Sequence, residues 1–345
     1  MNTLKRAVIT VCLVILPCLF TGCQEYYAPL EDRGFEPMGG FYDGLSTVRS
    51  FSSDGTEKWG YADCNGNTVI PIEYNRTFEF SDGVGVVQKD GKYGAIDTQG
   101  NILIPFEYDG YNWNAPFSEG LVGFSKGGKY GFVDRNGTVQ IPFSFDYAFS
   151  FKEDLAPVAK GKNMDNSSWG FIDKSGELVI PYTYDFVFTF SEGYAYVEKD
   201  EKSGYIDKTG KAVIPLEYDY GLSFSEGLAP VMKSGMTGFI NKEGEVVLDF
   251  IYDYAYPFYE GFAAVERNTL YSFIDKEGNN VIDYKYSGIW GFNDGYTVVR
   301  TGLKWGFTDY SGKEIIPLVY DNVQYTGGGF AWVQKGSQWG VITVP

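Results

Sequence analysis

The chain has 345 residues, of which 44% are hydrophobic and 18% aromatic, so it contains ample material for a buried core. Its formal net charge is −17. An acidic surface repels phosphate backbones, so we expect no nucleic-acid partner. Histidine is absent, and with it the commonest general base and the usual nitrogen ligand of zinc.

Residues 1–22 have the features of a secretory signal peptide. Lys5 and Arg6 supply the positive start, and the run from residue 7 to residue 20 is apolar apart from Thr10. This run is too short to span a bilayer comfortably, and the small residues Thr21-Gly22 follow it. We therefore expect an exported protein.

The end of this segment, Leu19-Phe20-Thr21-Gly22-Cys23, resembles a bacterial lipobox. The resemblance implies that Cys23 becomes the mature N-terminus and carries a lipid that holds the protein at a bacterial membrane. Gln24 is not the Asp associated with inner-membrane retention, so the outer membrane is implied where the source has one. The alternative is an ordinary cleaved signal in which Cys23 is incidental.

Residues 23–40 show no hydrophobic periodicity and carry Pro29, Gly34 and Pro37. This composition predicts a short lipidated tether. The domain that follows would occupy residues 41–345.

A five-residue stretch, best seen as Trp169-Gly170-Phe171-Ile172-Asp173, recurs along that domain. A fixed period of about 34 residues is the signature of a tandem array of one supersecondary unit. The glycine, or the serine that replaces it once, recurs at Gly60, Gly94, Gly131, Gly170, Gly204, Gly238, Ser272, Gly306 and Gly340.

Each unit is expected to form a three-stranded antiparallel meander. A Phe-Ser-Glu-Gly segment opens it, as at residues 224–227, and short apolar strands follow. An Asp-x-x-Gly turn such as 207–210 links the second and third strands, because Asp can accept backbone hydrogen bonds and Gly can adopt a positive φ. Pro215 and its equivalents would end the third strand.

Two all-β arrangements of these eight to nine units are possible. A repeat of 34 residues holds three strands more easily than the four of a propeller blade. No third strand is evident near the N-terminus to complete the last unit. These points favour an open, twisted β array, and a closed propeller-like ring is the alternative.

These residues resemble the WG (KWG) repeat family of bacterial proteins across residues 41–345. The resemblance implies an all-β repeat with surface or interaction roles and no catalytic residues. We expect the aromatic ring of one unit to pack against the glycine of the next, where the missing side chain leaves space for it. These residues would then form the core. The structural repeat residues with tryptophan are Trp59, Gly60, Trp169, Gly170, Trp305, Gly306, Trp339 and Gly340.

The recurring carboxylates, such as Asp173 and Asp207, appear in almost every unit, as turn residues do and a single catalytic acid would not. No calcium-loop spacing occurs. We therefore expect no enzyme activity, no cofactor and no metal site.

Residues outside the repeat pattern are the candidate ligand contacts. Insertions near 49–58, 111–114 and 161–168 would map to loops, often on a binding face. Tryptophan outside the pattern can stack on a sugar or anchor a protein, although filling of the local core is the alternative for each residue. The candidates are Tyr111, Trp113, Trp290 and Trp332.

Two functions remain open from the sequence. The first is a non-catalytic, lipid-anchored scaffold that presents a repeat surface to a protein partner. The second is a surface protein that binds, or less readily cleaves, a glycan. The absence of histidine and of a singular acid cluster favours the first.

Overall fold

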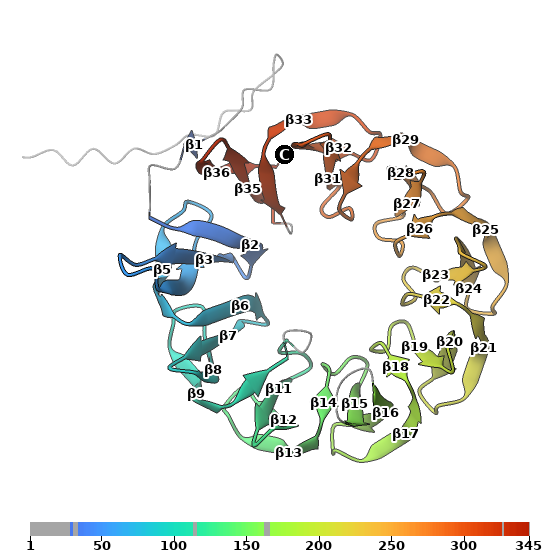
Figure 1. Cartoon of the computed structure of the whole chain (residues 1–345), viewed down its shortest axis with the longest axis horizontal. Coiled ribbons are helices and arrows are strands. Elements are labelled where there is room, and N and C mark those ends of the chain that lie inside the picture. Colours follow the sequence, from blue (N-terminus) through green and yellow to red (C-terminus); the bar gives the residue numbers. More distant parts are fainter. Residues whose placement is uncertain (1–27, 30–33, 113–115, 162–165, 326–327, 345) are drawn as a thin grey trace, which may run out of the picture.

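Nine four-stranded antiparallel sheets follow one another around a closed ring in the computed structural model, which describes residues 28–29, 34–112, 116–161, 166–325 and 328–344 (Figure 1). This is a nine-bladed β-propeller. It corrects the expected open array of three-stranded meanders.

A typical blade shows why 34 residues are enough for four strands. In blade 6 the innermost strand, β22 (Tyr220–Gly221), has two residues and pairs with β23 (Leu228–Lys233). Strands β24 (Met236–Asn241) and β25 (Val246–Tyr252) complete the sheet. One residue, Asp219, joins β22 to the outermost strand of blade 5, which ends at Tyr218. The fourth strand therefore adds very few residues to each repeat. This is why the prediction of three strands was wrong.

The remaining blades repeat this order from the inside outwards. Blades 1 to 3 contain β2 (Glu36–Tyr42), β3 (Leu45–Phe51), β4 (Glu57–Ala62), β5 (Thr68–Tyr74), β6 (Arg76–Ser81), β7 (Val84–Lys89), β8 (Lys92–Ile96), β9 (Ile102–Tyr108), β10 (Gly110–Tyr111), β11 (Leu121–Lys126), β12 (Lys129–Asp134) and β13 (Val139–Phe145). Blades 4 and 5 contain β14 (Tyr147–Ala148), β15 (Leu155–Gly161), β16 (Ser167–Asp173), β17 (Leu178–Tyr184), β18 (Phe186–Val187), β19 (Tyr194–Lys199), β20 (Lys202–Asp207) and β21 (Ala212–Tyr218). Blades 7 to 9 contain β26 (Tyr254–Ala255), β27 (Ala263–Arg267), β28 (Leu270–Ile274), β29 (Asn280–Tyr286), β30 (Gly288–Ile289), β31 (Tyr296–Thr301), β32 (Lys304–Asp309), β33 (Glu314–Tyr320), β34 (Asn322–Tyr325), β35 (Phe330–Lys335), β36 (Gln338–Thr343) and β1 (Ala28–Pro29).

The N-terminal strand closes the ring. β1 pairs antiparallel with β36, placing Ala28 opposite Val341 and Pro29 opposite Gly340, so it is the outermost strand of blade 9. Inside this junction, Trp332 of β35 stacks on Phe41 of β2 at 5.5 Å between ring centroids. The first and last blades therefore meet, and the ring begins before residue 41.

The Asp-x-x-Gly turns have the expected chemistry. The Asp207 carboxylate accepts hydrogen bonds from the backbone N–H groups of Thr209 and Lys211, at 2.9 and 3.1 Å. Gly210 has a φ of +84°, which a residue with a side chain rarely adopts. An added Cβ at Gly210 would also lie 3.3 Å from Ile180 of the preceding blade, so the turn packs directly on its neighbour.

The glycine of the Trp-Gly pair has a different role from the one expected. A Cβ on Gly170 would lie 2.4 Å from the carbonyl oxygen of Ile180 in β17, the adjacent strand of its own blade. There the register of β16 and β17 shifts between Trp169 and Phe171, and Pro181, which lacks an N–H, lies in the irregular stretch. The glycine therefore accommodates a bulge in its own sheet rather than an aromatic ring of the next unit, and the strand continues past the proline to Tyr184.

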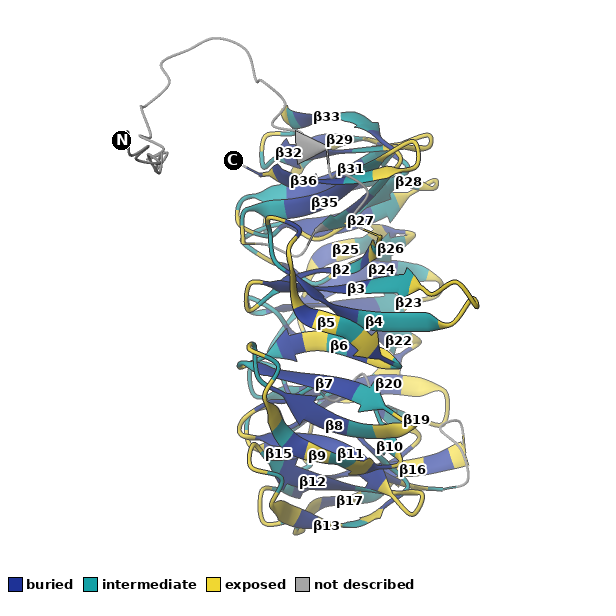
Figure 2. Cartoon of the chain, turned by 90° about the vertical axis from the view of Figure 1, so that its left-hand side faces the viewer, coloured by how far each residue is buried: buried dark blue, intermediate teal, exposed yellow. Residues whose placement is uncertain are grey.

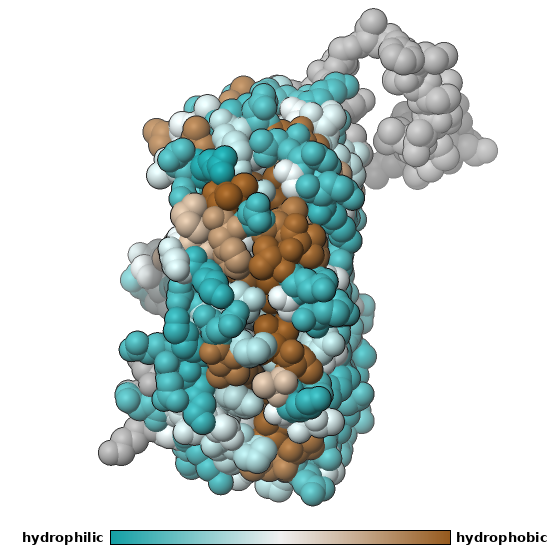
Figure 3. All heavy atoms as spheres, turned by 90° about the vertical axis from the view of Figure 1, so that its right-hand side faces the viewer, coloured by the Kyte–Doolittle hydropathy of each residue, from teal (hydrophilic) through white to brown (hydrophobic). Residues whose placement is uncertain are grey.

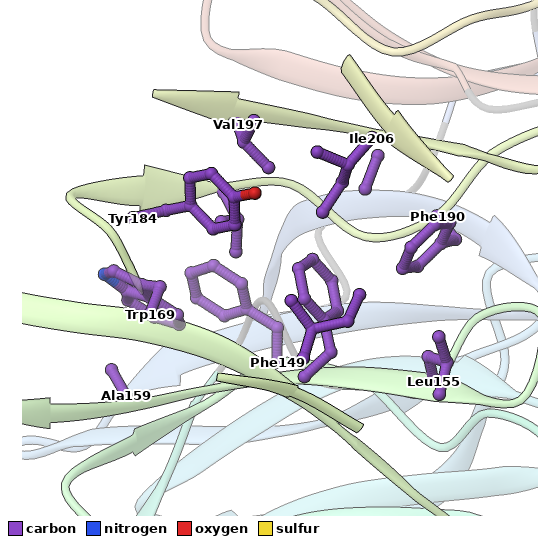
Figure 4. Packing of buried hydrophobic residues seen from close by; sticks show 12 residues of the cluster. Phe149, Leu155, Ala159, Trp169, Tyr184, Phe190, Val197 and Ile206 are labelled. Atoms are coloured by element: carbon purple, nitrogen blue, oxygen red, sulfur yellow. The ribbon is translucent and has the colours of Figure 1, made fainter. Parts of the chain in front are cut away.

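The core consists of clusters between successive blades. Trp169 and Phe171 of blade 4 are fully buried and pack with Val197 and Ile206 of blade 5 (Figure 4). The ring of Trp169 lies 4.7 Å from that of Phe149. In the edge-on view the middles of the strands are buried and the turns are exposed on both faces of the ring (Figure 2).

Candidate functional site

The Phe-Ser-Glu-Gly segments join neighbouring blades. The Glu192 carboxylate of blade 5 accepts a hydrogen bond from the backbone N–H of Gly227 at 2.9 Å and forms an ion pair with Lys242 at 3.2 Å, both in blade 6. Ser191 donates from its hydroxyl to the carbonyl of Phe224, also in blade 6, at 2.7 Å. Each such segment therefore attaches its blade to the next.

Other segments make the same carboxylate contacts. Glu119, Glu153 and Glu226 each accept a backbone N–H from the following blade and pair with a lysine of that blade: Lys174, Lys208 and Lys276. Burial raises the pKa of the Glu192 carboxyl. The hydrogen bond from the Gly227 N–H and the nearby Lys242 ammonium together lower it by more, so the net pKa lies below its ordinary value. These groups are stabilised in their charged form.

The aspartates of several Tyr-Asp pairs also link two blades. Asp219 accepts a hydrogen bond from Lys202 of blade 5 at 2.7 Å and from the backbone N–H of Ser234 in blade 6 at 2.6 Å. Asp321 makes the same pair of contacts with Lys304 and Gly336. The repeated acids thus have structural partners that account for their recurrence.

Neither a metal-binding cluster nor a membrane-spanning helix occurs in the described part of the chain. Within it, no three His, Cys, Asp or Glu side chains come together in a group that can hold a metal ion. The same residues include no helix with the length and apolar character to cross a membrane.

The residues singled out from the sequence lie in different places. Cys23 and Trp113 fall outside the described residues. Trp332 is fully buried against Phe41 and Phe35, at the junction of the last and first blades. A ligand approaching the folded ring has no access to this side chain.

Tyr111 lies between blades 2 and 3. Its ring is 4.7 Å from Phe78 and 5.9 Å from Phe124. Burial raises the pKa of the Tyr111 hydroxyl above its ordinary range. This residue contributes chiefly to packing between the two blades.

Trp290 is at the surface, with 37% of its area exposed. Its ring lies 5.9 Å from that of Trp305, and the Arg300 guanidinium lies over Trp305 at 5.0 Å. The position is a repeated one: Trp290 follows β30 as Phe188 follows β18 and Tyr256 follows β26. Trp290 therefore belongs to the pattern, which the sequence reasoning missed because a two-residue strand has no visible alternation.

Two further exposed aromatics were missed. Tyr256 is 42% exposed and Tyr259 is 52% exposed, both in blade 7. Tyr259 stands where Ser191 and Ser225 stand in other Phe-Ser-Glu-Gly segments, and this departure was visible in the sequence. We define the aromatic surface of blades 7 and 8 as Tyr256, Tyr259 and Trp290.

The outer circumference carries a separate set of apolar side chains. On β25, Val246, Val247 and Ile251 are 48%, 44% and 42% exposed. Hydrophobic atoms follow this edge of the ring between polar ones (Figure 3).

The WG containing repeat matches eight successive segments, residues 59–93, 93–130, 130–163, 169–202, 204–236, 238–271, 271–305 and 305–339. The chain belongs to the WG-repeat family. No protein with curated information matches it.

Among solved structures, one titled as the eukaryotic initiation factor is similar over 94% of this chain and 92% of its own, with a TM-score of 0.59 and 10% sequence identity. AztD from Citrobacter koseri is similar over 89% of this chain and 96% of its own, at 11% identity and a TM-score of 0.43. Puromycin hydrolase is similar over 86% of this chain and 55% of its own, at 12% identity and a TM-score of 0.43. At these identities the first likeness shows the fold alone, and the other two are too distant to support an argument.

Proposed function

We propose that this WG-repeat propeller is a non-catalytic, lipid-anchored protein of the cell envelope that presents its ring to a protein partner. The observation that carries the proposal is the use of the repeated carboxylates: Glu192, Asp219 and their equivalents are bonded between blades. A rigid ring held in this way is suited to displaying a surface.

The aromatic surface of blades 7 and 8 is the part of the ring that suits such a partner. Tyrosine and tryptophan are the residue types that contribute most to protein interfaces. At the position of Tyr256 and Trp290, blade 4 carries Phe149, which is only 6% exposed. Blades 7 and 8 thus carry solvent-exposed aromatic side chains with a polar atom where blade 4 has a buried phenylalanine. This difference supports a role in binding.

The membrane anchor would lie close to the ring. Cys23 is five residues before Ala28, the first residue of β1. Even a fully extended chain of that length spans only about 17 Å. A lipid on Cys23 would therefore hold blade 9 near the membrane. Replacing Cys23 with Ser should abolish incorporation of a labelled fatty acid, and failure of the wild-type chain to take up the label would refute the anchor.

The partner can be sought with matched variants of the purified full chain. Envelope proteins should be captured by the wild type and by a Phe51→Ala control, which alters an exposed aromatic of blade 1. Capture should be reduced for Trp290→Ala and Tyr259→Ala. A set of captured proteins that is the same for all four chains would contradict the proposal, and saturable binding to a glycan array without protein capture would favour the glycan alternative.

A further inference from the structure

Blade 7 carries three tyrosines and one glutamate close together: Tyr254 on β26, Tyr256 directly after that strand, Glu266 on β27 and Tyr271 on β28. Tyr254 is opposite Glu266, and Glu266 is opposite Tyr271, so the three side chains share one face. The ring of Tyr256 is 5.1 Å from that of Tyr254, at 76° to it. We call Tyr254, Tyr256, Glu266 and Tyr271 the tyrosine cluster.

Glu266 occupies a position that carries an acid in only one other described blade, where Glu198 of blade 5 lies opposite Phe186. The residues at its register position in the flanking blades are Met232, opposite Tyr220, and Arg300, opposite Gly288. The fold therefore does not require a carboxylate there. Its presence needs a different explanation from that of Glu192 or Asp219.

Neighbouring cations are engaged elsewhere. Arg267 lies over the ring of Tyr284 at 6.0 Å and donates to the carbonyl of Ile251. Arg300 lies over Trp305 and donates to the carbonyl of Ser287. No lysine or arginine within the described ranges forms an ion pair with Glu266. The carboxylate is thus available to an incoming cation.

The cluster is accessible and its hydroxyls stay protonated. Tyr256 is 42% exposed, and Tyr254, Glu266 and Tyr271 are each partly exposed. Burial, with hydrogen bonding to Glu266 and its negative charge, raises the pKa of Tyr271 to about 12. At neutral pH the rings are therefore uncharged, with the electron-rich faces that attract cations.

We propose that the tyrosine cluster binds the ammonium group of a lysine side chain on the protein partner. The ring faces and the Glu266 carboxylate supply complementary charge at short range, and the net charge of −17 draws basic segments toward the ring. This inference rests on the proposed function, because it specifies the chemistry of that partner.

The test is a titration of the full chain, with its tyrosine rings isotope-labelled for NMR. The probe is the capped tripeptide Gly-Lys-Gly, and its neutral counterpart carries norleucine in place of lysine. The lysine peptide should shift ring signals of the cluster saturably, in the millimolar range, and the norleucine peptide should not.

Variants make the result specific. Glu266→Gln and Tyr256→Leu should each weaken binding of the lysine peptide about fivefold. The matched control is Glu198→Gln, at the same register position in blade 5, where the Tyr196 hydroxyl lies 3.4 Å from the carboxylate. Unchanged melting temperatures would show that the ring is intact in all three.

Equal binding of the norleucine peptide, or equal loss in Glu266→Gln and Glu198→Gln, would overturn the lysine site. So would the absence of any response to the lysine peptide. Partner capture that depends on Trp290 but not on Glu266 would refute this inference alone and leave the proposed function standing.

Discussion

At the scale of single residues, the Trp-Gly pair combines a buried ring with a close backbone approach. Trp169 is fully buried between blades 4 and 5. Gly170 lies directly against the carbonyl oxygen of Ile180 within its own sheet. The two residues thus serve different interfaces, one between blades and the other between strands.

Replacing Trp169 with Ala should lower the free energy of unfolding by about 3–5 kcal/mol, because it removes a large buried side chain and leaves a cavity. Trp290→Ala is the control and should cost much less, since that ring is 37% exposed. Chemical denaturation of both variants measures the difference. Equal losses would contradict the packing between blades 4 and 5.

Gly170→Val should destabilise the ring by about 1–3 kcal/mol through overpacking against β17. Blade 7 offers a natural comparison, because Ser272 occupies the same position and its hydroxyl donates to the carbonyl of Ile282. Gly170→Ser should therefore cost less than Gly170→Val. The melting temperatures of the two variants test this order. A lower melting temperature for Gly170→Ser than for Gly170→Val would show that the bulge is not the reason for glycine at this position.

At the scale of elements, the Phe-Ser-Glu-Gly turn is a connector between sheets. Its serine and glutamate both bond to the next blade, as Ser191 and Glu192 do. Blade 9 has Gly328 in the corresponding turn rather than an acid. The junction between blades 9 and 1 relies instead on β1 and on aromatic packing around Trp332.

Glu192→Gln should reduce stability by about 1 kcal/mol at neutral pH, because the side chain is partly exposed and its ion pair is screened. The pKa of Glu192 is lowered from its ordinary value of 4.5. The contribution of the ionised Glu192 to the free energy of unfolding is therefore fully present above about pH 4.5. It is lost as the pH falls through the lowered pKa of Glu192 in the folded state.

Melting temperatures across this acid range check the effect. The wild type should lose stability below about pH 4.5 more steeply than Glu192→Gln does. The control is Glu243→Gln, an exposed residue of an Asp-x-x-Gly-type turn. A Glu192→Gln profile that parallels the wild type at every pH would rule out this linkage.

At the scale of the whole molecule, closure involves the two-residue strand β1, Ala28–Pro29, together with the aromatic packing around Trp332. β1 covers the edge of β36, which would otherwise expose unpaired backbone groups. Most other neighbouring blades are also joined by a continuous chain, because each outer strand runs into the next inner strand. The chain also runs from β1 of blade 9 into β2 of blade 1, but within blade 9 only the antiparallel pairing joins β36 to β1.

A chain that begins at Gly34 should therefore melt at a lower temperature than one that begins at Gln24 and should associate through the uncovered edge of β36. Small-angle scattering and light scattering of the two chains measure shape and mass. A compact, monomeric ring with unchanged stability in the shorter chain would show that β1 is dispensable for closure.

The sequence by itself determined the features that are local and repeated. The spacing of the Trp-Gly pairs, the all-β character and the Asp-x-x-Gly turns could all be predicted, because each depends on residues a few positions apart. The structural role of the recurring acids follows from their periodicity, although their partners in the next blade do not.

Only the tertiary structure decided that the array closes. Closure joins Ala28 to Val341, and no local pattern specifies that pairing or the angle between successive blades. One signal was present: Ala28-Pro29-Leu30-Glu31 resembles the outer-strand segment Ile214-Pro215-Leu216-Glu217. The tyrosine cluster likewise depends on strand register, which places Tyr254, Glu266 and Tyr271 on one face although none of them stands out along the chain.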